Sequence, residues 1–316
     1  MFKLAFDIPE SKEKINIKDL ILMIGSCFSD EIGSRLSQSK FNTLRNPFGT
    51  VYNPYSIFKL LFNDLSEDFV SHEEIYLHWD THGAISGLSK NKLFKVLEDK
   101  RRQTQSYLEN GKWLVITLGT AIVYELKKGR IVANCHKVSA DHFTKRFLSK
   151  QEIVNQFKLL NEKLYQTNPH LNIVFTVSPV RHIKDGLIEN NRSKAILIDA
   201  VHEIVHENSQ TSYFPSYEIL IDELRDYRFY AKDMAHPSDQ AIDYVWQQFK
   251  KTYLDPETQQ LTNDLAKLIS AVEHRPFHPT SNGHQRFLKN TLQKLQQMNE
   301  KLDVNVEIEQ IRSQII

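Results

Sequence analysis

Short runs of apolar residues alternate along the first 254 residues with longer segments whose apolar positions recur at helical spacing. The apolar runs lie at residues 20–24, 113–118 and 173–177, with weaker ones at 122–126, 131–133 and 212–214. Their continuity is typical of strands that are buried on both faces of a sheet. The helical patterns lie between them, at residues 53–63, 91–110, 150–166, 190–207 and 237–253. Such an alternation predicts parallel strands that are joined by helical crossovers.

This pattern predicts an α/β fold, a three-layer α/β/α sandwich over residues 1–254. Residues 64–89 fit the alternation poorly, and we interpret them as a possible insertion that carries a short hairpin. Beyond residue 254 two polar-rich helical segments follow with no strand between them, at residues 261–272 and 287–302. We therefore expect a helical C-terminal extension over residues 255–316.

The composition indicates a folded chain without a strongly charged surface. The 316 residues are 41% hydrophobic and 25% charged, and 40 basic against 39 acidic residues leave a net charge of +1. A charge balanced in this way gives no reason to expect a nucleic-acid partner. No apolar run approaches the roughly 20 residues that span a bilayer. We expect no secretory signal at the N-terminus, because its apolar residues form no sustained run. Two cysteines, Cys27 and Cys135, are too few for a disulfide framework, so we expect reduced thiols in the cytoplasm.

The first candidate for chemistry is the string Gly25-Ser26-Cys27-Phe28, which follows the first strand and precedes a helical pattern. A thiol and a hydroxyl therefore lie on a strand-to-helix turn, where backbone N–H groups converge and favour a developing negative charge. A helix N-terminus together with a neighbouring imidazolium lowers a thiol pKa below its usual value of about 8.5. We expect Cys27 to be the nucleophile, with Ser26 as the alternative. Cys27 as a small buried residue that closes the strand is the structural alternative.

The second candidate is Asp233-Met234-Ala235-His236, some two hundred residues later. A carboxylate three positions before an imidazole is close enough to hold the tautomer of the ring while the ring takes a proton. Pro237 disfavours helix at the residue before it, which places His236 on a loop. An Asp that caps the following helix, with a nearby His by chance, is the alternative explanation.

Several other polar residues are weaker candidates. His78, Asp80 and His82 alternate, so on a strand they would share one face, as the ligands of a metal site can. A polar edge strand that faces water is the favoured interpretation, and we expect no metal. Cys135 with the neighbouring His136 is better explained by a buried thiol. Arg181 follows the strand at 173–177, where ligands of open α/β sheets collect, and is a candidate partner for a substrate carboxylate or phosphate.

Five strings of this chain resemble the signature of the GSCFA domain family, a largely uncharacterised bacterial group. They are Gly25-Ser26-Cys27-Phe28-Ser29, Asn46-Pro47-Phe48-Gly49 with Tyr52-Asn53-Pro54, Leu118-Gly119-Thr120-Ala121, Ser178-Pro179-Val180-Arg181-His182 and Asp233-Met234-Ala235-His236-Pro237. Ser29 stands where the family motif has Ala. The group is in turn similar to the SGNH/GDSL hydrolases, a doubly wound α/β superfamily that cleaves or transfers acyl groups. This resemblance implies a mostly parallel, flavodoxin-like sheet.

The SGNH resemblance also implies roles for individual residues. Its opening Gly-Asp-Ser block falls on Gly25-Ser26-Cys27, so that Cys27 stands at the usual serine position, and its Asp-x-x-His block falls on Asp233 and His236. The glycine whose N–H helps to bind the oxyanion corresponds to Gly49. The Gly-x-Asn block falls on Gly119-Thr120-Ala121, where Ala121 has no side-chain donor. The missing oxyanion donor would then come from Thr120 or Asn134, and loss of one such donor typically costs about 100- to 1000-fold in rate.

Together these features predict an acyl-ester hydrolase or acyltransferase that acts through a covalent acyl-enzyme on a small-molecule or glycan-linked ester. Cys27, or Ser26, would attack the carbonyl, His236 would act as base and then acid, and Asp233 would orient it. Backbone N–H groups of Cys27 and Gly49 would hold the oxyanion, without metal or organic cofactor. The alternatives are a catalytically inactive module that binds carbohydrate or protein, which Ala121 motivates, and a scaffold that dimerises through its C-terminal helices. The sequence indicates no oligomeric state.

Overall fold

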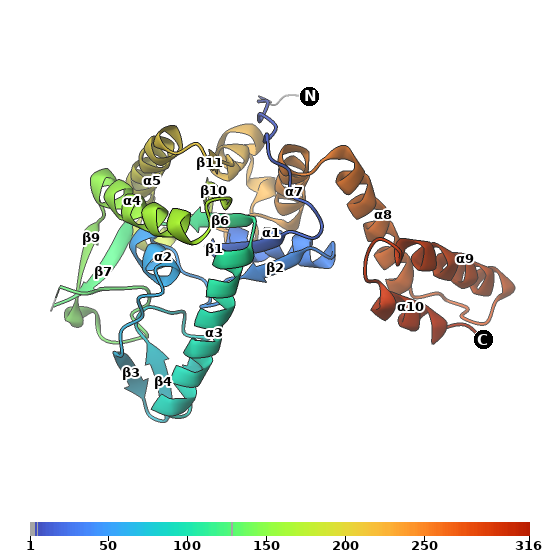
Figure 1. Cartoon of the computed structure of the whole chain (residues 1–316), viewed down its shortest axis with the longest axis horizontal. Helices are drawn as coiled ribbons and strands as arrows, with labels where there is room; N and C mark the ends of the chain where they lie inside the picture. The colour runs from blue at the N-terminus through green and yellow to red at the C-terminus, as the bar shows by residue number, and fades with distance from the viewer. Residues whose placement is uncertain (1–3, 5, 128) are drawn as a thin grey trace.

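A five-stranded parallel sheet forms the centre of the computed structural model, which describes residues 4, 6–127 and 129–316 (Figure 1). Its strands are β1 (Leu20–Gly25), β2 (Asn42–Arg45), β6 (Trp113–Leu118), β10 (Asn172–Val177) and β11 (Thr211–Tyr213). They lie in the order β2-β1-β6-β10-β11, and every neighbouring pair is parallel. This is the flavodoxin-like order, in which the direction of winding reverses between β1 and β6.

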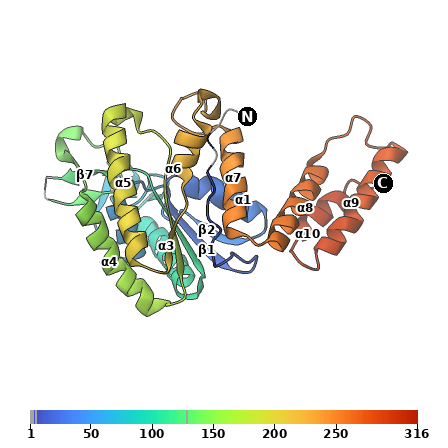
Figure 2. The same ribbon diagram turned by 90° about the horizontal axis from the view of Figure 1, so that it is seen from above.

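Helices cover both faces of this sheet, which confirms the predicted three-layer α/β/α sandwich (Figure 2). One face carries α2 (Pro54–Leu61), α3 (Lys90–Asn110), α4 (Lys150–Thr167) and α5 (Leu187–Glu207). The other carries α1 (Cys27–Gln38), α7 (Asp239–Tyr253) and the helical turn η3 (Ile219–Leu224), which directly follows α6 (Ser216–Glu218). Successive side chains of a strand point to opposite faces. In β1, Leu22 and Ile24 therefore pack with the first set of helices, whereas Ile21 and Met23 pack with the second.

Side-chain caps define where several helices begin. Ser149 and Glu152 form a reciprocal capping box at α4, and the side chain of Asn53 accepts the N–H of Ser56 at α2. At α7 the cap is Ser238, whose hydroxyl accepts the N–H of Ala241. The helix thus begins two residues later than the predicted start at 237, and His236 lies on the preceding loop as expected.

Two small antiparallel sheets flank the main one. The predicted strands at 122–126 and 131–133 exist as β7 (Ile122–Leu126) and β8 (Ile131–Val132), but they pair with β9 (Phe143–Phe147) in a sheet of their own. Their apolar sequence does not identify their partners, which is why they looked like strands of the parallel sheet. Residues 64–89 carry the hairpin β3 (Phe69–His72) and β4 (Ile75–His78), followed by β5 (Ser86–Gly87). That this segment is an insertion stays a prediction.

The last helices form a unit to one side of the sheet (Figures 1 and 2). They are α8 (Pro256–Glu273), α9 (Asn282–Met298) and α10 (Asn305–Arg312), which share a hydrophobic cluster that includes Leu265, Leu288 and Leu295. Lys40 pairs with Glu307 at 2.8 Å, and Lys250 Nζ donates to Asn263 Oδ1 at 2.6 Å, so polar contacts join this unit to the sandwich. Among the described helices, none has both the length and the apolar character to cross a bilayer.

Four short helical turns complete the described elements. Three are 3-10 turns and one is a π-helical turn, and they all lie in connections between larger elements: η1 (Ala140–His142), η2 (Ile183–Asp185), η3 (Ile219–Leu224) and η4 (Tyr227–Phe229). The loop between η4 and α7 carries His236, and η2 lies just after β10. Both segments therefore reach the carboxyl ends of the parallel strands, where open α/β sheets bind ligands.

Candidate active site

The turn after β1 is fixed by hydrogen bonds to both neighbouring strands. Gly25 has φ 130°, and a Cβ at this position would collide with the carbonyl group of Thr117 on β6. Its N–H donates to Asn46 Oδ1 at 2.8 Å, while the N–H of Ser26 donates to Thr117 O at 3.1 Å. Glycine is required here because other side chains rarely adopt this φ and none would fit the space. The turn therefore places Cys27 at the start of α1, beside the point where the sheet reverses its winding.

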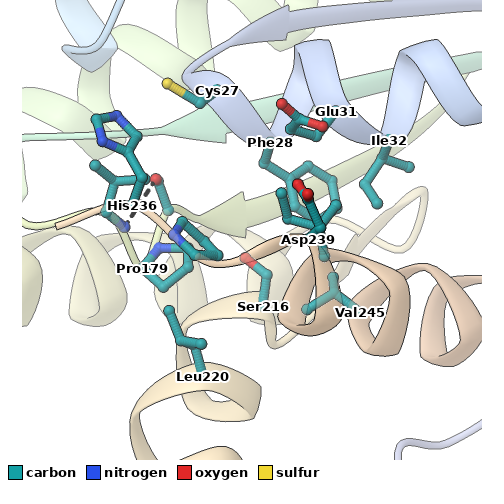
Figure 3. Close-up of a pocket in the computed structure, with 14 residues that line it drawn as sticks. Cys27, Phe28, Glu31, Ile32, Pro179, Ser216, Leu220, His236, Asp239 and Val245 are labelled. Atoms are coloured by element: carbon teal, nitrogen blue, oxygen red, sulfur yellow. Dashed lines mark hydrogen bonds between the residues drawn. The ribbon is translucent and has the colours of Figure 1, made fainter. Parts of the chain in front are cut away.

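Cys27 and Ser26 differ in their access to the cleft. Ser26 is 1% exposed, and its side chain makes no capping hydrogen bond to α1. The side chain of Cys27 is partly exposed and lines the cavity in Figure 3. The Cys27 side chain is therefore accessible from the cleft, whereas the Ser26 hydroxyl is buried.

The surroundings of Cys27 do not activate the thiol in the way the helix N-terminus suggested. Burial raises the pKa of the Cys27 thiol, and the carboxylate of Asp30, one turn later in α1, raises it further. Asp30 in turn accepts the hydroxyl of Thr50 at 3.1 Å. The thiol is therefore protonated at neutral pH, and the expected lowering of its pKa is wrong. Nucleophilic attack from this position requires a base.

His236 and Asp233 form the predicted pair. Asp233 Oδ2 lies 2.6 Å from His236 Nδ1, and Asp233 Oδ1 accepts the N–H groups of Ala235 and His236, both at 3.0 Å. These hydrogen bonds hold the pKa of the Asp233 carboxyl well below its ordinary value, because they favour its charged form. With Nδ1 engaged by the carboxylate, the other ring nitrogen is left to exchange a proton. Figure 3 shows this ring on the same side of the cavity as the Cys27 sulfur.

Arg181 contacts the loop that carries Asp233 and His236. Its guanidinium stacks over the ring of Tyr230, 4.1 Å from the ring centroid, and donates to the carbonyl of Met234 at 3.1 Å. Met234 has φ 57°, a left-handed conformation that is uncommon for such a side chain. Arg181 thus supports the strained turn between Asp233 and His236. It also lines a cavity next to Cys27, so its pairing with a substrate carboxylate or phosphate stays a prediction.

Three backbone N–H groups near the proposed oxyanion site, including that of Gly49, are already occupied. The N–H of Gly49 donates to Asn46 O at 2.8 Å, and the N–H groups of Gly119 and Thr120 both donate to Tyr52 O, at 2.7 and 3.1 Å. The assignment of the Gly49 N–H as an oxyanion donor does not agree with this geometry, and the N–H of Gly119 is not free for this role either. The Gly49 bond closes a turn within its own loop, whereas the Gly119 bond holds the segment after β6 against the loop at Tyr52. The N-terminal turn of α1, which includes the N–H of Cys27, is the better candidate.

The two side chains named as replacement donors lie in different places. Thr120 lines a cavity next to Cys27, and its hydroxyl lies 3.0 Å from Ser193 Oγ and accepts the N–H of Ile122 at 3.0 Å. Asn134 contacts the neighbouring loop, where its Oδ1 accepts the N–H of His136 at 2.9 Å. Asn134 is not among the described residues that line either cavity at Cys27. Thr120 is therefore the better placed of the two residues.

The alternating histidines after β3 are engaged within the fold. His78 Nε2 lies 2.8 Å from Ser66 O, and its Nδ1 accepts the N–H of Asp80 at 3.1 Å. Asp80 pairs with Lys59 at 2.8 Å and with Arg130 at 3.0 Å. Among the described residues no group of three or more potential ligands is arranged to hold a metal ion. In Cys135, burial raises the pKa of the thiol, and this cysteine lines neither cavity at Cys27.

Of two further residues near the cleft, Lys194 was missed by the sequence analysis, and His182 was named there only as part of a motif. Lys194 on α5 is 1% exposed and donates to Gly119 O and Ser178 O, both at 2.6 Å, and burial lowers its pKa to about 7. His182 lies against the ring of Tyr52, and burial together with the charge of Lys194 lowers its pKa to about 4, so its ring is neutral at neutral pH. The helical spacing that places Lys194 on the buried face of α5 with Leu197 was a signal that could have identified it.

Two cavities meet at Cys27, Val180 and His236. The first has a volume of about 250 Å³ and lies between α1, α7 and the ends of β10 and α6 (Figure 3). The second, of about 430 Å³, is lined by Tyr52, Thr120, Arg181, His182 and Asp233, among others. A concave site in which a thiol faces an oriented imidazole is suited to attack on a carbonyl group and to proton transfer to a leaving group.

Comparisons with known proteins agree with the motifs. The model of the GSCFA family matches residues 20–249, and the model of the C-terminal domain of GSCFA domain proteins matches residues 265–316. No curated protein is matched by its sequence.

Two solved structures show distant similarity to this chain. One, from Streptococcus pneumonia and named for platelet activating factor, is 12% identical with a TM-score of 0.43, over 74% of this chain and 83% of its own. The other, a carbohydrate esterase family 3 structure from Talaromyces cellulolyticus, is 10% identical with a TM-score of 0.27, over 51% of this chain and 68% of its own. Similarities this low carry no argument about chemistry.

Proposed function

The chain belongs to the GSCFA family, and from that premise and the geometry of its cleft we propose that it is an acyl-ester hydrolase or acyltransferase that uses Cys27 as nucleophile. The carbonyl carbon of a small or glycan-linked ester would be the point of attack. The proposal includes no metal ion and no organic cofactor, because the thiol and the imidazole supply a nucleophile and a proton carrier.

One observation carries the proposal. Cys27 at the start of α1 and His236 before α7, which are 209 positions apart in the sequence, line the same two cavities at the carboxyl ends of the parallel strands. His236 is at the same time held by Asp233 at 2.6 Å. A structural cysteine and a chance histidine would have no reason to share a cleft with an orienting carboxylate.

The geometry supports a two-step reaction. His236 takes the proton of the Cys27 thiol as the sulfur forms a bond to the carbonyl carbon, and the electron pair of the C=O bond moves to the oxygen. Backbone N–H groups in the first turn of α1 stabilise that oxyanion. When the C=O bond reforms, the alkoxide leaves with the proton from His236 and a thioester remains on Cys27. Water, or an acceptor hydroxyl in a transferase, then attacks the thioester with His236 again as base.

The test combines turnover with detection of the covalent intermediate. A panel of p-nitrophenyl esters and thioesters is offered to the wild type and to Cys27→Ala, His236→Ala and Cys135→Ala, and intact mass is measured after rapid quenching. We expect an acyl adduct on the wild type, none on Cys27→Ala, and turnover lower by about 100-fold or more in His236→Ala, since general-base catalysis typically contributes that much.

Cys135→Ala is the matched control, because Cys135 is the other cysteine and is also partly exposed. Its adduct and turnover should equal those of the wild type. Equal turnover in Cys27→Ala and the wild type, or an adduct located on Cys135, would overturn the proposal.

A binding module is the second candidate, and one observation favours it. The N–H groups of Gly49, Gly119 and Thr120 are all committed to the fold, so the oxyanion would depend on α1. A module of this kind would bind its ligand in the cleft without forming an adduct. In that case carbohydrates or esters would slow the alkylation of Cys27, and intact mass would show the unmodified chain.

A further inference from the structure

The two cavities that meet at Cys27 differ in chemical character. Nonpolar side chains form most of the wall of the 250 Å³ cavity, namely Phe28, Ile32, Pro179, Val180, Leu220, Pro237, Ile242 and Val245. The larger cavity carries polar and charged groups, among them Asn53, Thr120, Arg181, Lys184, Asp185 and Asp233. A substrate bound across Cys27 would therefore place one part in nonpolar surroundings and the other in polar surroundings.

The nonpolar cavity is held open by the core. Ile32 and Leu220 are each 1% exposed and belong to the hydrophobic cluster on this face of the sheet. The ring of Phe28 packs against Phe214 and Phe249, with centroids 5.8 and 6.4 Å apart. Such a wall does not have to be ordered when a ligand enters, and a largely preformed pocket is typical of small-molecule sites.

Figure 3 shows how this cavity extends from the thiol. Cys27 and His236 lie at one side, whereas Ile32 and Val245 lie at the other. A chain attached to a carbonyl carbon at the sulfur would thus run between α1 and α7. The volume of about 250 Å³ accommodates about eight groups of the size of a methylene, taking roughly 30 Å³ for each, the share of a water molecule in the liquid.

The charged residues of this cavity have one sign. Glu31 and Asp239 line it, and no Lys or Arg is found among its described lining residues. An acyl group with a carboxylate at its far end would be repelled, whereas a hydrocarbon chain would not.

We propose that the cavity between α1 and α7 is the acyl subsite of this chain, and that it takes a neutral, unbranched acyl group of short to medium length. The alcohol part of the ester then occupies the polar cavity beside Tyr52 and Thr120. This inference rests on the proposed function, and it adds the class of acyl group and the place where it binds.

The test uses p-nitrophenyl esters from acetyl to dodecanoyl, with kcat/KM measured for each. Each methylene that enters the cavity should raise kcat/KM about fourfold, so that the optimum lies between butyryl and octanoyl. For acyl chains longer than the cavity, kcat/KM should fall. A succinyl monoester should react at least tenfold more slowly than the butyryl ester. The two acyl groups have the same number of carbon atoms, and butyryl has a methyl group in place of the terminal carboxylate.

The variant Ile242→Phe fills the cavity from α7. We expect its chain-length optimum to move to shorter esters, with octanoyl turnover reduced at least tenfold and acetyl turnover changed less than threefold. The matched control is Ile75→Phe, because Ile75 is exposed on β4 and lies outside both cavities at Cys27. Val245→Ala enlarges the same cavity and should move the optimum to longer esters, which tests the inference by a second, opposite change.

A readout without catalysis separates the inference from the function. Hexanol should slow the alkylation of Cys27 by iodoacetamide in the wild type and in Ile75→Phe, but not in Ile242→Phe. Suppose that Cys27 forms the acyl adduct, but the dependence of kcat/KM on chain length is the same in Ile242→Phe, Val245→Ala and Ile75→Phe. This result would overturn the acyl subsite and leave the proposed function intact. If hexanol protects the wild type but not Ile242→Phe from alkylation, and no acyl adduct forms on Cys27, the catalytic function would be overturned and a nonpolar ligand site would be supported. If neither hexanol protection nor an acyl adduct is observed, the acyl subsite and the proposed function would both be overturned.

Discussion

The reactivity of Cys27 is decided by the residues that surround it. Helix α1 offers converging N–H groups, which favour a thiolate, whereas burial and the carboxylate of Asp30 favour the thiol and raise the pKa. His236 is therefore needed as a base rather than as a partner in a preformed ion pair. The thiol of this chain resembles the hydroxyl of a serine nucleophile in that it depends on proton transfer at the moment of attack.

Replacing Asp30 by Asn should lower the pKa of Cys27, because it removes the nearby negative charge that raises this pKa. The measurement is the rate of Cys27 alkylation between pH 6 and 10, followed by mass spectrometry. At neutral pH we expect alkylation about threefold faster, which corresponds to a shift of about half a unit. The control is Asp7→Asn, since Asp7 is exposed and far from the cleft in sequence. An unchanged pH profile in Asp30→Asn would show that this carboxylate does not act on the thiol.

At the scale of elements, the loop between η4 and α7 determines where His236 lies. An isolated bridge joins Tyr230 to Pro237, and the N–H of Ala231 donates to His236 O at 2.8 Å. Arg181, from the segment after β10, stacks on Tyr230 and donates to Met234 O. The position of the imidazole thus depends on a neighbouring connection as well as on its own loop. We regard Arg181 as a positioning residue.

Replacing Arg181 by Met should lower ester turnover about tenfold, because the stack and the hydrogen bond to Met234 are lost and His236 is less well placed. Cys27 alkylation should stay at the wild-type rate, since Arg181 does not contact the thiol. Arg181→Lys, which keeps the charge above Tyr230, should recover part of kcat. Arg192→Met is the matched control, because Arg192 stacks on Phe147 at 4.8 Å outside both cavities. Equal losses in both Met variants would contradict the positioning role.

At the scale of the whole molecule, Lys194 joins three elements in the core below the cleft. Its ammonium group on α5 donates to the carbonyls of Gly119 and Ser178, which follow β6 and β10. Burial lowers its pKa from 10.5 to about 7. Above this pH the folded chain releases the proton while the unfolded chain keeps it, up to the ordinary pKa. The contribution of Lys194 to stability therefore rises with pH across this range.

Lys194→Met should remove this pH dependence. The free energy of unfolding, measured by urea titration, should increase from pH 7 to pH 9 by on the order of 2 kcal/mol more in the wild type than in the variant. The difference between the two proteins isolates Lys194, because other titrating groups are common to both. At pH 7 the variant should also be less stable by about 1–3 kcal/mol, since two buried carbonyls lose their donor. A constant difference between the proteins from pH 7 to pH 9 would contradict the lowered pKa.

Much of the architecture could be predicted from local pattern. The strand at 113–118 agrees with β6 residue for residue, and the α/β/α layering followed from the alternation of buried strands with helices. β2 and β9 were not given bounds, because β2 has no buried residue and β9 carries exposed Thr144 and Lys145. The pairing of β7 with β9 also could not be predicted, since apolar content does not specify a partner strand.

For the site, the sequence by itself determined what depends on neighbours along the chain: the strand-to-helix turn at Cys27, and the Asp233–His236 pair, whose three-residue spacing allows direct contact. Only the tertiary structure decided which hydroxyl or thiol is accessible, which N–H groups are committed, and that Lys194 lies beneath the cleft. The physical reason is that burial and hydrogen-bond partners come from segments far apart in the chain. Residue type and spacing describe a group's capacity for chemistry, and the packing around it determines whether that capacity is available.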